Sequence, residues 1–148
     1  TVNFRRAATI TASVFLVALC LSTTLSDPAQ AFNLREMDRQ EINNLQDKLT
    51  TCAAYYTITA KGIENSGDRE SAVETAKLSD RLFEMAVVIG KGIDMTEDAI
   101  KSRLGINIQN MMEDMNYDFV NYSVLMDEYD GRCSRLVRQI EDNLQNLK

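Results

Sequence analysis

The sequence contains no histidine and no tryptophan, and it has one proline and six glycines in 148 residues. Without histidine there can be no Ser-His-Asp triad, no Cys-His nucleophile pair and no histidine-ligated zinc or haem. Because proline and glycine are the residues that break helices, their scarcity favours long helical segments. The composition, 45% hydrophobic and 26% charged, is that of a folded protein, and the length fits one domain.

Acidic residues outnumber basic ones, and the formal net charge is −6 at pH 7. A nucleic-acid-binding protein displaces counterions with a basic surface, so this charge argues against nucleic acid as a partner. Paired carboxylates could support acid–base catalysis or calcium binding, but their helical spacing opposite the apolar residues predicts a solvated face. We therefore expect no catalytic residue, no metal and no cofactor. The acidic groups concerned are Glu113, Asp114 and Asp118, and then Asp127, Glu128 and Asp130.

The N-terminal segment has the pattern of a secretory signal. Two arginines at positions 5 and 6 precede an apolar run over residues 7–25, and the small residues Ala29 and Ala31 follow. A basic start, an apolar centre and an A-x-A ending predict export and cleavage between Ala31 and Phe32, as in bacterial signals.

We accordingly expect a cleaved signal peptide at 1–31 and a single helical domain at 32–148, located in the periplasm or outside the cell. After cleavage no stable membrane span remains. Two alternatives stay open: an uncleaved membrane anchor, and a lipoprotein modified at Cys20.

Removal of the signal leaves two cysteines, Cys52 and Cys133. An even cysteine count in an exported chain predicts a disulfide. A loop of about 81 residues would be closed, which stabilises the fold by roughly 4–5 kcal/mol in the chain-entropy model. Neither cysteine belongs to a C-x-x-C motif, which argues against a redox pair. A bridge between two chains is the alternative.

Apolar residues of the mature chain recur every three or four positions, as in Ile42, Leu45, Leu49 and Cys52, which predicts amphipathic helices. The pattern Asn33 to Glu36 predicts a capping box at the start of the first helix. Turn signals follow at residues 65–67 and 90–92. The predicted helices cover 33–64, 69–91, 95–115 and 118–147.

The cysteines also bear on topology. If the segment after residue 95 were one unbroken helix, Cys133 would lie roughly 40 Å beyond the level of Cys52, far more than a disulfide can span. We therefore predict a chain reversal near residues 116–120 and an all-α fold, a small antiparallel bundle of four helices. The alternative is three helices, the last one long, with the disulfide between chains.

Tyrosines and methionines gather near the cysteines. Packing around the disulfide is the main interpretation for Tyr55, Tyr56, Tyr122 and Tyr129, and an interaction patch is the alternative. Met111, Met112, Met115 and Met126 are interpreted as core residues, with Cu(I) binding as the alternative.

These features favour an exported, non-enzymatic binding or accessory protein, whose partner is a protein or a cell-envelope component; the oligomeric state stays open. In its size class and cysteine count the chain is similar to small periplasmic acid-stress chaperones. That resemblance implies a second hypothesis, a chaperone that opens at low pH. A carboxylate-based hydrolase and a Cu(I)-binding protein are the remaining alternatives.

Overall fold

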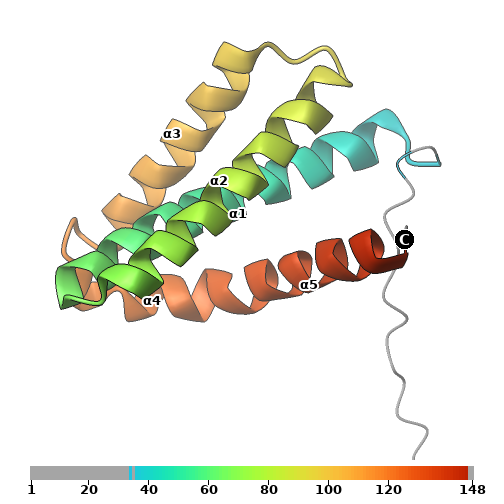
Figure 1. Cartoon of the computed structure of the whole chain (residues 1–148). Helices are drawn as coiled ribbons and strands as arrows, with labels where there is room; N and C mark the ends of the chain where they lie inside the picture. The colour runs from blue at the N-terminus through green and yellow to red at the C-terminus, as the bar shows by residue number, and fades with distance from the viewer. Residues whose placement is uncertain (1–33, 35, 147–148) are drawn as a thin grey trace, which may run out of the picture.

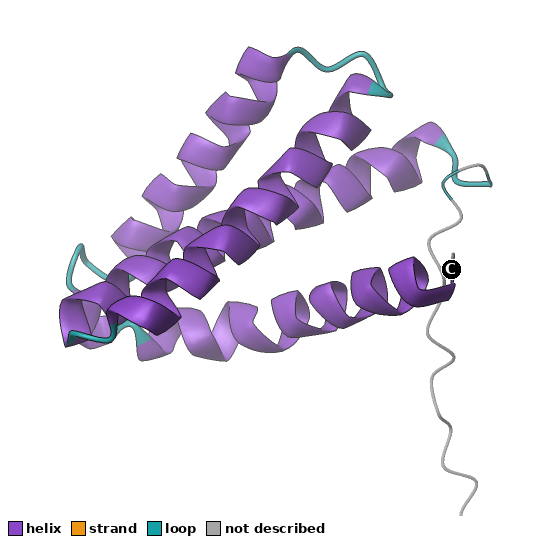
Figure 2. Cartoon of the chain, in the orientation of Figure 1, coloured by secondary structure: helices purple, strands orange, loops and turns teal. Residues whose placement is uncertain are grey.

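The computed structural model describes Leu34 and residues 36–146. The predicted signal peptide, and with it the cleavage site between Ala31 and Phe32, lies outside the described residues. Within them the chain is all-α and has no strand (Figures 1 and 2). The long helices are α1 Arg39–Ser66, α2 Arg69–Lys91, α3 Glu97–Asp114 and α5 Gly131–Asn146. This confirms the predicted small antiparallel helical bundle with four principal helices.

The chain reverses near residues 116–120, as predicted from the distance that a disulfide can span. After α3 the backbone of Asn116 and Tyr117 is left-handed, with φ of 52° and 58°. The 3₁₀ turn η1 (Phe119–Asn121) follows, and the carboxylate of Asp118 caps it by accepting from the Val120 N–H at 3.0 Å. One helical run then continues to residue 146 through α4 (Ser123–Leu125), the π-helix η2 (Met126–Asp130) and α5.

Helix α1 is central, because α2, α3 and α5 each contact it. In Figure 1, α1 and α2 cross the molecule together, α3 diverges from them, and α5 runs back below toward the C-terminal end. The buried apolar cluster draws residues from all of these helices, including Leu49, Leu82, Met111 and Leu136.

The starts of the helices follow capping chemistry. Asp38 begins α1 with a capping box: its side chain accepts from the Glu41 N–H, and the Glu41 side chain accepts from the Asp38 N–H, both at 2.8 Å. The predicted start of the first helix at residue 33 is wrong for the described residues: Leu34 and residues 36–38 are not helical, and the capping box lies five residues further on than the predicted one. Asp68 and Thr96 cap α2 and α3.

Gly90, near the end of α2, packs against Ile100 of α3. A Cβ atom at this position would stand 2.6 Å from Cδ1 of Ile100, which is fully buried. A larger residue at this position would force the Ile100 side chain to shift. The predicted turn at residues 65–67 is confirmed as well, since Gly67 ends α1 with a φ of 95°.

Candidate functional site

The disulfide joins the middle of α1 to the first turn of α5. Cys52 and Cys133 are bridged with an S–S distance of 2.06 Å and a Cα–Cα distance of 5.4 Å. Both residues are buried. The bridge is internal to one chain, as the four-helix arrangement requires, and it fixes α5 against α1.

The four tyrosines lie together beside this bridge. Tyr55 is at the centre, and its ring centroid is 5.1 Å from that of Tyr56, 6.4 Å from that of Tyr122 and 6.1 Å from that of Tyr129. Tyr55 is 2% exposed, whereas the other three are half-buried. Burial raises the pKa of Tyr55, Tyr56 and Tyr129 above the usual 10.0 and so further favours the neutral phenols.

A hydrogen-bond chain satisfies the buried phenols. The Tyr122 hydroxyl donates to the Tyr55 hydroxyl at 3.2 Å, and Tyr55 in turn donates to Asp130 Oδ1 at 3.2 Å. Thr59 Oγ1 lies within hydrogen-bonding distance of the Tyr122 hydroxyl. This network ties α1 to the segment just before α5. The sequence pattern placed Asp130 only among solvated acids, so its role as acceptor was missed.

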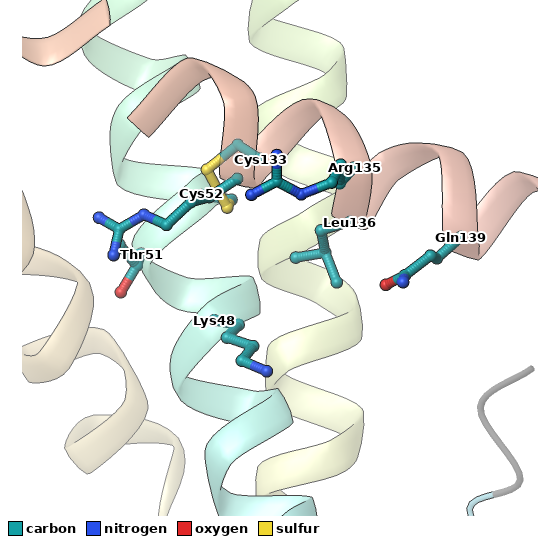
Figure 3. A pocket seen from close by; sticks show the side chains of 8 residues that line it. Lys48, Thr51, Cys52, Cys133, Arg135, Leu136 and Gln139 are labelled. Atoms are coloured by element: carbon teal, nitrogen blue, oxygen red, sulfur yellow. A yellow bond between two sulfur atoms is a disulfide. The ribbon is translucent and has the colours of Figure 1, made fainter. Parts of the chain in front are cut away.

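An open cleft lies on the other side of the bridge, between α1 and α5 (Figure 3). Its volume is about 370 Å³. Lys48 of α1 and Gln139 of α5 stand on either side of it, and the disulfide forms part of its wall (Figure 3). The remaining lining residues are Thr51, Arg132, Arg135 and Leu136.

This cleft gathers positive charge in an acidic chain. Arg132 also interacts with the preceding turn of its own helical segment. Its Nη2 is 3.5 Å from Glu128 Oε1, and its guanidinium carbon is 4.8 Å from the Tyr129 ring centre. Lys48 and Arg135 form no ion pair with any other described residue. The cleft therefore presents two unneutralised cations and a third that is partly neutralised.

The sequence pattern did not predict this cleft. The sequence does show that the lining residues of each helix share one face. Lys48 and Thr51 are three residues apart on one helix, and Arg132, Arg135 and Gln139 are three or four residues apart on another. That the two stripes face each other follows only from the disulfide, which brings their helices together.

The other residues singled out from the sequence lie apart from the cleft. Met111 and Met115 are buried in the core, whereas Met126 is 48% exposed. The acidic residues of both groups are exposed. In the described part of the chain, no three cysteine or carboxylate side chains come together as metal ligands.

No helix within the described ranges is long and apolar enough to cross a membrane. Comparisons of the chain with protein families, with curated proteins and with solved structures found no match.

Proposed function

We propose that this chain is an exported, non-enzymatic binding protein that holds an anionic group in the cleft between α1 and α5. The observation that carries the proposal is the cation cluster of Lys48, Arg132 and Arg135 in an open cleft of a chain whose net charge is −6. Cations gathered against the overall charge create a local field that attracts an anion.

The lining chemistry suits carboxylate or phosphate groups. Arginine offers a planar fork of N–H donors that pairs with two oxygens at once, and lysine adds a point charge. The Thr51 hydroxyl and the Gln139 amide supply neutral donors beside them. A volume of about 370 Å³ falls in the lower range of small-ligand sites. The ligand is then a free anion or the anionic group of a protein or cell-envelope component.

The proposed location rests on the N-terminal pattern. Arginines 5 and 6, the apolar run and Ala31 match the pattern of a secretory signal, and an exported chain reaches an oxidising compartment in which a disulfide persists. The periplasm or the extracellular space is the compartment we propose.

Hydrogen bonds stabilise the ionised form of four surface carboxylates. Hydrogen bonds from neighbouring lysines lower the pKa of Glu64, Glu74 and Glu97, and hydrogen bonds from the side chain and then the backbone of Ser71 lower the pKa of Asp68. A general acid near neutral pH needs the opposite shift. These residues are exposed and act as ionised surface groups.

The test is a titration of the isotope-labelled protein with inorganic phosphate and with citrate, followed by NMR. We expect both anions to shift the amide signals of residues 48–52 and 132–139. Arg135→Gln should weaken binding by about tenfold, since a charge-assisted hydrogen bond contributes roughly 1.5–3 kcal/mol.

The matched control is Lys77→Gln, which removes one exposed positive charge on α2, where Lys77 pairs with Glu74 at 2.7 Å. This variant should bind both anions with unchanged affinity. If both variants bound the anions equally weakly, the loss of affinity would come from the change in net charge and not from the cleft. No shift with either anion at millimolar concentration would overturn the cleft as a binding site.

The acid-stress chaperone remains a second proposal, supported by the same lowered pKa values. Each lowered carboxylate stabilises the fold above its unfolded-state pKa, and this stabilisation is lost as the pH falls. The fold should therefore loosen in acid. Suppression of client aggregation at pH 3 but not at pH 7 would support a chaperone, and a folded, inactive protein at pH 3 would exclude it.

A further inference from the structure

Positive side chains of two different helices face each other across the cleft, and the disulfide holds these helices together. Lys48 lies one helical turn before Cys52 in α1. Arg132 and Arg135 lie on either side of Cys133 in α5. Because like charges repel, the cations of α1 and α5 oppose the approach of the helices that the bridge enforces.

Few other contacts join α5 to α1. The two helices approach each other closely at few positions besides the bridge. The hydrogen bond from Tyr55 to Asp130 holds the segment that precedes α5, and Leu136 and Ile140 pack into the buried cluster. The bridge is the covalent link between the two helices, and it forms part of the cleft wall itself (Figure 3). The width of the cleft therefore depends on the bridge.

We propose that the disulfide controls anion binding in this cleft: the oxidised chain binds the anion, and the reduced chain releases it. This inference rests on the proposed anion-binding function. An anion between the helices neutralises the repulsion between their cations, and the bridge keeps those cations close enough for one anion to contact both helices. By linkage, the bound anion disfavours reduction by the same factor by which reduction weakens anion binding.

The reduction itself adds to this coupling. A dithiol reductant gives up two electrons and two protons and closes its own disulfide, while the bond between Cys52 and Cys133 breaks and two thiols form. Cations beside a thiol stabilise its thiolate form and thereby favour the reduced state. An anion bound to Lys48, Arg132 and Arg135 offsets this stabilisation. Both effects have the same sign, because in each the anion favours the oxidised chain.

The experiment equilibrates the protein with mixtures of oxidised and reduced dithiothreitol, with and without citrate. Alkylation of the thiols followed by intact mass gives the ratio of oxidised to reduced chains, and chloride at equal ionic strength controls for screening. With citrate at ten times the dissociation constant of the oxidised protein, this ratio should rise about tenfold, which is about 30 mV for a two-electron couple. An unchanged ratio would overturn the proposal.

Two charge variants test whether the coupling comes from the cleft. Arg135→Gln weakens citrate binding about tenfold, so the same citrate concentration should raise the ratio only about twofold. Lys77→Gln removes an exposed charge on α2, where Lys77 pairs with Glu74, and should keep the tenfold rise. Equal rises in the two variants would overturn the proposal, because the coupling would then not involve the cations of the cleft.

Unfolding of the reduced chain would imitate this coupling, so the anion affinity of the reduced chain is measured as well. Sucrose favours compact states and is present for both redox states, and circular dichroism follows the helix content. In an NMR titration with phosphate, the reduced chain should keep its helices and bind at least about tenfold more weakly than the oxidised chain. Equal affinities would overturn the proposal. Loss of the helices would overturn it too, because the bridge would then maintain the whole fold rather than the cleft.

These measurements separate the two proposals. Anion binding by the oxidised chain without coupling to the disulfide would overturn only the redox control. Absence of anion binding by the oxidised chain would overturn both the redox control and the proposed function.

Discussion

Reduction of the disulfide should remove a large part of the stability of this fold. Cys52 and Cys133 are 81 positions apart, and closing a loop of that length lowers the entropy of the unfolded chain by an amount worth about 4.5 kcal/mol at 25 °C. Domains of this size are stable by roughly 5–15 kcal/mol in total. The reduced protein should therefore approach the limit at which it stays folded.

The assay is urea denaturation of the oxidised protein, the reduced protein and the double variant Cys52→Ala/Cys133→Ala. With a slope of about 1.5 kcal/mol per molar urea, reduction should lower the midpoint by roughly 3 M. The reduced protein keeps both sulfur atoms in place and therefore isolates the effect of the covalent link. The double variant should lose about 1 kcal/mol more, because both side chains are buried and their removal leaves space.

The result that refutes this reasoning is a loss below about 1 kcal/mol on reduction with the slope unchanged. It would mean that the linked and the open unfolded chains have nearly the same conformational freedom. Hydrogen exchange gives an independent reading: α5 should lose protection before α1 and α2 do, because few contacts besides the bridge join it to α1.

Three further predictions concern packing and pH. Gly90→Ala should destabilise the fold by about 1–2 kcal/mol in urea unfolding, because the new Cβ would collide with Ile100, whereas Gly105→Ala, with open space around it, should stabilise by about 0.5–1 kcal/mol. Burial raises the pKa of Tyr55 above its usual 10.0, so the folded state favours the neutral phenol. The contribution of Tyr55 to the free energy of unfolding is therefore fully present below pH 10 and decreases above it. Urea midpoints measured between pH 9 and 11 should fall less in Tyr55→Phe than in the unmodified protein. Hydrogen bonds from two neighbouring lysines lower the pKa of Glu97 from 4.5 to about 2. The contribution of Glu97 to the stability of the fold is therefore present above pH 4.5 and is lost as the pH falls toward 2. An NMR titration of the carboxyl group measures this pKa directly, and a midpoint near 4.5 would contradict the ion pairs.

The helices and the chain reversal could be predicted because they depend on local patterns and one covalent constraint. Turn signals located α2 and the end of α1 to within two residues, and the distance that a disulfide can span required the turn near Asn116. The start of α1 was misplaced because a polar residue followed by an acid three positions later occurs twice, at Asn33 and at Asp38, and only the second caps the helix.

The cleft could not be predicted in the same way. It depends on the angle at which α5 crosses α1, which no local pattern encodes. The sequence contains Lys48 and Arg135 as ordinary charged positions on two separate amphipathic helices. Their convergence follows from the Cα–Cα distance of 5.4 Å at the bridge together with the rotation of each helix about its axis.

The position of the bridge also determines what a protease can release. Residues 52 and 133 enclose all of α2 and α3 in one covalent ring. A single cut in the turn at residues 92–96 would open that ring and leave two fragments that stay attached through the sulfur atoms. Such a nicked protein would migrate as one species on a non-reducing gel and as two after reduction. In an oxidising compartment, a chain of this design tolerates one cut between α2 and α3 without losing either half.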